Sequence, residues 1–145
     1  MSHDDALERL RVSLMELFAA QRRLRGRDAR IEDGISFAHF QLLSVLFEHG
    51  EMSARRLSAE AGLTPASVTE MLDALARSGV VERTRSETDR RVIVNRLTPE
   101  GRERVGEKRA QLMERWNEAL RDLETGDVEA AQRVIGLLAR YLESL

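Results

Sequence analysis

The sequence lacks residues on which several classes of protein depend. Cysteine is absent, which excludes a disulfide framework, cysteine zinc sites and a thiol-based redox switch. No stretch approaches the roughly 18 consecutive apolar residues of a membrane span. The N-terminal MSHDDALERL contains no apolar signal segment. We therefore expect a cytoplasmic protein that does not contact membranes.

Catalytic and metal-binding motifs are missing as well. The sequence contains no HExxH, GxSxG or glycine-rich phosphate loop, the patterns that hold a metal, a nucleophile or a phosphate. A metal sensor that uses His39 or His49 is a weaker alternative, because no spacing to nearby acidic residues supports it. We expect no enzymatic activity, no cofactor and no metal.

Aromatic residues are scarce, at 4% of the 145 residues. The core must therefore be built mostly from Leu, Val and Ala, which suits packed helices. A chain of this length is about one domain, and it buries enough surface to fold without metals or disulfides. We expect residues 1–145 to form a single domain.

Charge is unevenly distributed along the chain. The net charge is −2, from 23 basic and 25 acidic residues. Residues 77–96 carry six arginines against three acids, and residues 22–30 carry five arginines against one aspartate. Two basic segments on an acidic body indicate a nucleic-acid-binding protein. A solvated charged face is the alternative.

Capped helices are predicted in the middle of the chain. Ser36 is placed to cap a helix that runs to His49. Ser53 caps a short helix, and Thr64 followed by Pro65 begins another, which ends near a glycine. Two short helices joined by a tight turn that contains glycine form a helix-turn-helix pattern.

The periodicity then changes from helical to alternating. The β-branched runs Val80–Thr84 and Val92–Leu97 flank the polar loop Arg85–Arg91, which predicts a β-hairpin with an arginine-rich tip, or wing. Such a tip fits the narrow, electronegative minor groove of DNA. Asp89 is expected to hold the shape of the loop through a bidentate pair with a neighbouring guanidinium.

Long apolar stripes mark both ends of the chain. Residues 4–28 show the alternating spacing of three and four that is typical of an a/d seam. Similar stripes follow in a helix from about Thr98 to Leu123 and in a last helix, with a break at Gly126 and Asp127. A winged helix of about 60 residues cannot cover these stripes, so they predict a homodimer. Bundling within one chain is the alternative.

The predicted fold is therefore mainly α with a small β-hairpin. We expect a winged helix-turn-helix lobe over about residues 35–97. The N- and C-terminal helices, at about 4–28 and 99–145, are expected to form a dimerisation lobe.

The helix that begins at Pro65 offers small side chains near its N-terminus, where base edges lie in the major groove. The residues in its first turns are Pro65, Ala66, Ser67, Thr69 and Glu70. The hydroxyls can read donors or acceptors, and Glu70 can accept a hydrogen bond from a cytosine N4 amine. These features predict double-stranded DNA as a partner.

A family resemblance is carried by residues 63–103, LTPASVTEMLDALARSGVVERTRSETDRRVIVNRLTPEGRE. The specific elements are the Asp89-Arg90-Arg91 tip, the strand after it and the junction from Leu97 and Thr98 to Gly101. In these the chain resembles the MarR family of bacterial regulators, named for multiple antibiotic resistance. The resemblance implies a ligand-responsive transcription regulator, usually a repressor. Such a protein binds a palindromic operator as a triangular homodimer whose first, fifth and sixth helices intertwine.

The resemblance also implies roles for individual residues. It places Arg90 and Arg91 at the minor groove, Ser67 and Thr69 near bases, and Ser53 and Arg77 at phosphates. The predicted DNA-binding set is Ser53, Pro65, Ala66, Ser67, Thr69, Glu70, Arg77, Arg85, Asp89, Arg90 and Arg91. One departure is the acidic outward face of the reading helix, where the family suggests basic residues. Glu70 is either a specificity element or a brake on non-specific binding.

A small aromatic or carboxylate effector is the last partner that the resemblance implies. Its predicted pocket is apolar with few polar groups, and its candidate residues are Arg11, Leu14, Phe18, His39, Leu43 and Trp116. The alternative is that these residues are core. For the chain as a whole, the rival function is a protein–protein module on a winged-helix scaffold, which would not need arginines at the hairpin tip.

Overall fold

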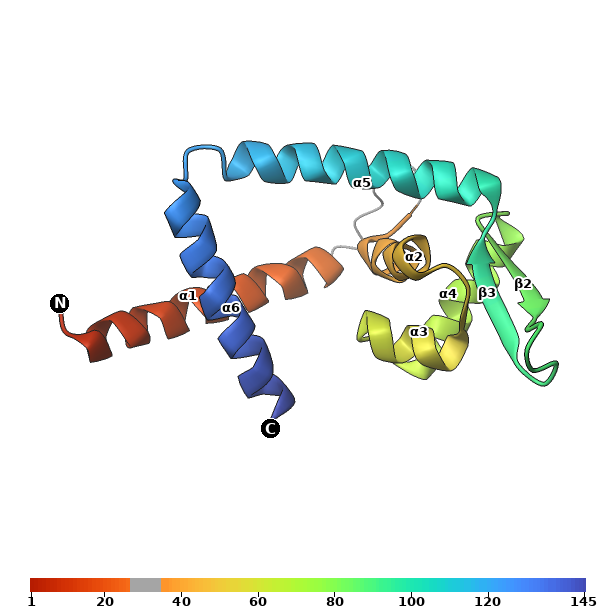
Figure 1. The fold of residues 1–145 in the computed structure, drawn as a ribbon, viewed down its shortest axis with the longest axis horizontal. Coiled ribbons are helices and arrows are strands. Elements are labelled where there is room, and N and C mark those ends of the chain that lie inside the picture. The colour runs from red at the N-terminus through yellow and green to blue at the C-terminus, as the bar shows by residue number, and fades with distance from the viewer. Residues whose placement is uncertain (27–34) are drawn as a thin grey trace. The chain divides into compact units, whose positions relative to one another are not determined.

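The computed structural model describes residues 1–26 and 35–145 and confirms a mainly helical fold with a small sheet. The chain divides into two compact units, Met1–Gly106 and Glu107–Leu145. The elements are α1 (His3–Gly26), α2 (Phe37–His49), β1 (Met52–Ser53), α3 (Ala54–Ala61), α4 (Pro65–Arg77), β2 (Val81–Arg85), β3 (Ile93–Leu97), α5 (Pro99–Ala119) and α6 (Thr125–Glu143) (Figure 1). Over the described ranges, no helix combines the length and apolar character needed to cross a membrane.

The predicted helix caps are confirmed. The backbone N–H groups of His39, Arg56 and Ser67 donate to the side-chain oxygens of the caps at 3.1, 3.2 and 3.2 Å. The three caps are Ser36, Ser53 and Thr64. Each such cap satisfies an N–H that the helix itself leaves unpaired, and it stabilises the helix by about 1 kcal/mol.

A closed core holds the winged helix-turn-helix together. It joins the buried faces of α2, α3 and α4 to the sheet. Its most deeply buried apolar residues are Leu42, Leu43, Leu46, Leu57, Val68, Leu72, Val80 and Val105. The expectation of a core rich in Leu and Val is confirmed, but alanine, which was expected beside them, contributes no buried residue over the described ranges.

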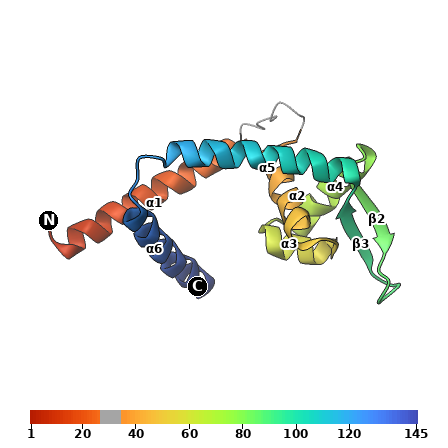
Figure 2. The ribbon, with the colours of Figure 1, turned by 45° about the horizontal axis from the view of Figure 1, so that its top comes forward.

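The sheet has three strands rather than the two predicted. Its order is β1-β3-β2, and both pairings are antiparallel. Strand β1 was not predicted because two residues are too short for an alternating pattern to show. The buried amide of Asn95 strengthens its attachment, since Nδ2 donates to the Met52 carbonyl at 3.1 Å. Figure 2 shows the β2–β3 hairpin extending beyond the helices of the lobe.

Several element boundaries differ from those predicted. Helix α5 ends at Ala119 rather than Leu123, and Gly126 and Asp127 lie in the first turn of α6. Asp127 suits that place because a carboxylate is favoured at the positive end of a helix. The predicted end of the first helix at residue 28 lies outside the described residues, as do three charged residues of the basic segment 22–30.

Helix α5 is fastened to the base of the hairpin at its first turn. The Thr98 hydroxyl donates to the Gly79 carbonyl at 2.6 Å, and its oxygen accepts from the Gly101 N–H at 3.0 Å. A Cβ atom on Gly101 would lie 2.0 Å from the Val80 carbonyl oxygen. Further along, the Arg102 guanidinium stands 4.6 Å from the ring centre of Phe47. The junction therefore needs glycine at 101.

Candidate nucleic-acid interface

Helix α4 has one face in the core and one face in solvent. Val68, Leu72 and Leu75 are buried. A set of residues on the other side is exposed and forms the outward face of α4: Pro65, Ala66, Thr69, Glu70, Asp73 and Arg77. Ser67 lies at the edge of this face and is partly buried. The structure thus brings the predicted base-reading residues onto one solvent-facing surface.

The hydroxyl groups of α4 are held by local hydrogen bonds. The Thr64 hydroxyl donates to Ser67 Oγ at 2.8 Å. The Thr69 hydroxyl donates to the Pro65 carbonyl one turn back, at 3.0 Å. These bonds fix which hydroxyl still has a hydrogen to donate to a partner.

Backbone hydrogen bonds hold the wing loop in shape. The Ser86 N–H donates to the Val92 carbonyl at 2.9 Å, and the Val92 N–H donates to the Asp89 carbonyl at 3.0 Å. Asp89 Oδ1 accepts from the backbone N–H of Arg91 at 3.0 Å. The predicted bidentate pair between Asp89 and a guanidinium is therefore wrong. A carboxylate two residues before an N–H reaches it in a tight turn and leaves the arginine side chains free.

The wing arginines divide into structural and unpaired ones. Arg85 donates through Nη1 to the Arg90 carbonyl at 3.1 Å. Arg96 pairs with Glu82 across the hairpin at 2.7 Å, and this hydrogen bond raises the pKa of the Arg96 guanidinium. The side chains of Arg90 and Arg91 are exposed and bond to no residue in the ranges 1–26 and 35–145. Two unpaired cations therefore stand at the hairpin tip.

An ion pair connects α4 to the hairpin. Arg83 Nη2 lies 2.7 Å from Asp73 Oδ1, and both side chains are partly exposed. Beside this pair lies a depression of about 170 Å³, lined by Ala54, Thr69, Leu72, Arg83, Ile93 and Asn95. The outward face of α4 is thus continuous with the hairpin through Arg83.

Helix α3 adds cations that the sequence analysis did not select. Arg55 and Arg56 lie in its first turn beside the predicted phosphate contact Ser53, and both are exposed. Neither side chain bonds to a described residue. Two consecutive arginines directly after the cap of the first short helix were a signal for them, because phosphate contacts gather at helix N-termini.

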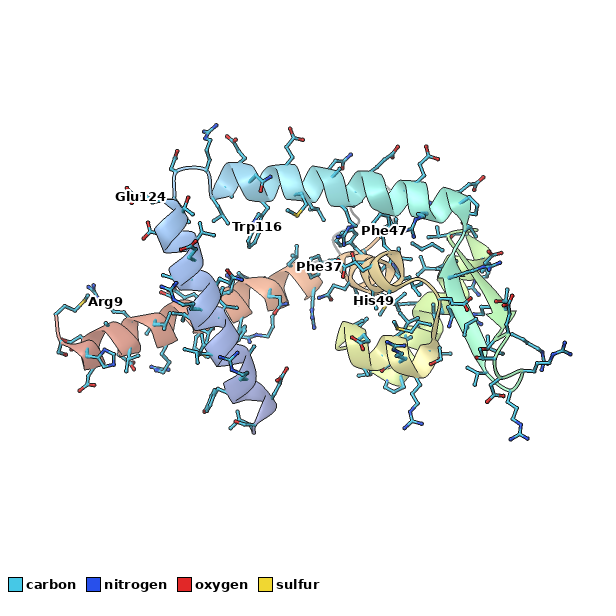
Figure 3. All side chains as sticks on the ribbon, viewed as in Figure 1. Arg9, Phe37, Phe47, His49, Trp116 and Glu124 are labelled. Carbon is cyan, nitrogen blue, oxygen red and sulfur yellow. The ribbon has the colours of Figure 1, made fainter. Side chains whose placement is uncertain are left out.

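The predicted effector residues lie in different surroundings. Leu43 belongs to the core and is fully buried, and His39 Nδ1 lies 3.0 Å from Ser36 Oγ in the capping box of α2. Arg11 pairs with Glu8 on α1, where the bond lowers the pKa of the glutamate. Leu14 and Phe18 on α1 are partly buried. Trp116 projects from α5 and is 61% exposed (Figure 3).

Comparisons with known proteins identify a family for this chain. The model of the MarR family matches residues 35–93. The chain is similar to YdgJ, an uncharacterized HTH-type transcriptional regulator of Bacillus subtilis: the two are 32% identical over 112 residues, which is 77% of this chain and 66% of YdgJ. It is also 31% identical over 99 residues to the HTH-type transcriptional repressor YetL of the same organism, 62% of this chain and 59% of YetL.

A solved structure shares the fold over nearly the whole chain. Streptococcus pneumoniae FabT, whose structure is in complex with DNA, superposes with a TM-score of 0.77 at 23% identity, over 95% of this chain and 98% of FabT. The family match covers the helix-turn-helix and the hairpin up to the start of β3. The chain belongs to the MarR family of transcription regulators.

Proposed function

We propose that this protein represses transcription by binding a palindromic operator as a homodimer. In each copy, α4 enters the major groove and the wing reaches the minor groove. The observation that carries the proposal is the pair of unpaired, exposed guanidiniums of Arg90 and Arg91 on the hairpin beside the outward face of α4. Arginine inserted into a narrow minor groove senses its width and its negative potential. The activity is binding without catalysis, and its place is the cytoplasm.

The apolar faces of the terminal helices support the dimer. On α6, Ile135 is 63% exposed and Leu142 49%, and both lie on one stripe with Val128 at spacings of seven. Helix α1 exposes a similar set: Leu7, Leu10, Val12, Met15, Leu17 and Leu24. Exposed apolar stripes of this length normally face another chain. A two-fold dimer then presents two copies of α4 to half-sites about 34–36 Å apart.

The test removes the wing cations. An Arg90→Ala, Arg91→Ala double variant should bind specific and random duplexes more weakly. Its slope of log K against log salt should fall by about one for each lost phosphate contact. An Arg115→Ala, Arg121→Ala variant removes the same charge from the other unit and serves as the matched control. Equal slopes for the wing variant and the wild type would remove the wing from the interface and favour the protein–protein module.

We also propose that a small aromatic or carboxylate effector weakens the binding of the protein to its operator. The partly buried apolar side chains of Leu14 and Phe18 support an apolar site on α1. Linkage requires operator DNA to weaken the effector by the same factor by which the effector weakens DNA binding. Calorimetry with a panel of aromatic acids, with and without DNA, on the wild type and Phe18→Ala, measures both factors. Binding that is indifferent to DNA and to Phe18 would contradict the proposal.

A further inference from the structure

The hydrogen bonds inside α4 determine what each of its side chains can offer to a base. Ser67 Oγ accepts from Thr64, so the hydrogen of the Ser67 hydroxyl remains available for donation. The Thr69 hydroxyl already donates to the Pro65 carbonyl. A hydroxyl has one hydrogen and two lone pairs, and Thr69 can therefore only accept. Ser67 can therefore donate to a base, whereas Thr69 cannot.

The two carboxylates of α4 differ in the same way. Asp73 is paired with Arg83 at 2.7 Å, which satisfies its charge within the protein. Glu70 is exposed and bonds to no residue that the structure describes. An ionised carboxylate offers acceptors alone. Glu70 is therefore the unpaired acceptor of the outward face of α4, beside the second acceptor Thr69.

We propose that α4 reads exocyclic amines, with Glu70 selecting cytosine and Thr69 accepting from the amine of a cytosine or an adenine. This inference rests on the proposed placement of α4 in the major groove. Guanine and thymine offer acceptors to a side chain in that groove, and adenine places its N7 acceptor next to its N6 amine. The edge of cytosine itself offers the N4 amine and no acceptor. A carboxylate is repelled by guanine and thymine, is opposed at adenine by N7 beside the amine, and is attracted by cytosine.

A binding-site selection from random duplexes tests the proposal. Wild-type full-length protein, Glu70→Gln and Asp73→Asn are each taken through the same selection. The wild type should select cytosine at one position of each half-site. Glu70→Gln should change that letter to adenine, because an amide reads adenine N6 and N7 bidentately. Asp73→Asn removes the same charge from the same helix and should leave every letter unchanged.

A base analogue then isolates the amine. In the selected operator, that cytosine is replaced by a pyrimidinone that lacks the 4-amino group. Wild-type binding should weaken by about 5- to 150-fold more than the binding of Glu70→Ala, the range of one specific base contact. The analogue also removes a hydrogen bond within the base pair. That loss is the same for both proteins, so it cancels in the comparison. At the base that Thr69 contacts, Thr69→Val should lose the preference for a base with an exocyclic amine, and Thr69→Ser should keep it.

The outcomes separate this inference from the proposed function. If the wild type selects no motif, sequence-specific binding itself fails. If it selects a motif in which Glu70→Gln changes no letter, or in which the Glu70 position holds guanine or thymine, the reading of amines is wrong and the proposed function stands. A change of letter in Asp73→Asn would also overturn the inference, because it would assign base reading to the paired carboxylate.

Discussion

The winged helix-turn-helix, in the first unit, and the C-terminal helix α6, in the second, differ in how far they cover their own apolar side chains. In Met1–Gly106, the leucines of α2 and α3 reach complete burial. Of the α6 residues, all of which the structure describes, none is buried. Leu137 and Tyr141 of that helix are 60% and 58% exposed. The core of the winged helix-turn-helix is thus closed by side chains of the same lobe, whereas the C-terminal helix exposes an apolar surface that no described residue covers.

The difference teaches where sequence changes will act. A core that is closed within one chain fixes the position of α4 against the sheet, so damage there should lower stability first. An apolar stripe that is open in one chain contributes free energy only on association, so damage there should lower assembly first. Each of the following predictions tests one side of this division.

The largest effect is expected from charges on the α6 stripe. An Ile135→Glu, Leu142→Glu double variant should be monomeric, because burying two carboxylates in an apolar interface is strongly unfavourable. A monomer holds a single half-site, so operator affinity should fall by about 10²- to 10⁴-fold, the usual gain from bivalent binding. Sedimentation and a gel-shift titration measure the two effects. Glu129→Gln, at a solvated position of the same helix, is the control. A double variant that still forms a stable dimer and binds the operator would show that the apolar stripe of α6 is not needed for assembly.

A smaller effect, on stability, is expected at the junction of α5 with the hairpin. In Gly101→Ala, the new methyl group meets the Val80 carbonyl oxygen at 2.0 Å. Because that oxygen belongs to the backbone and the methyl group is fixed to Cα, the two chain segments must move apart. The free energy of unfolding should fall by about 3 kcal/mol. Gly126→Ala is the matched control, because a Cβ there meets no atom within 4 Å and alanine favours a helix. Urea unfolding at one protein concentration compares them, and equal midpoints would show that the junction is not closed as described.

Local signals made much of the lobe predictable. Helix starts could be predicted at Ser36, Ser53 and Thr64, because a capping side chain bonds to a backbone N–H only three residues further along the chain. The hairpin is equally local, since its β-branched runs are separated by a short polar loop. The separation of core from outward residues on α4 follows from helical periodicity alone.

The missed features depend on partners distant in the sequence. Strand β1 exists because Met52 pairs with Asn95, 43 residues away. A strand of two residues is too short for its periodicity to predict this pairing. The end of α5 at Ala119 is also not marked locally, because the apolar stripe runs on to Leu123. The bond of Asp89 was missed for another reason: from sequence, a carboxylate between arginines can bind either a guanidinium or a backbone N–H.

The smallest effect is expected at the ion pair between Asp73 and Arg83, which crosses from α4 to the hairpin on the surface of the closed lobe. Its side chains are 50% and 36% exposed, so solvent screens their attraction, and such pairs stabilise a protein by about 0.2–1 kcal/mol. A double-mutant cycle with Asp73→Asn and Arg83→Gln should give a coupling in this range at low salt. At about 1 M salt the Debye length shortens to about 3 Å, and the coupling should vanish. A coupling of several kcal/mol that persists in salt would mean that this surface contact, rather than the aliphatic core, positions α4.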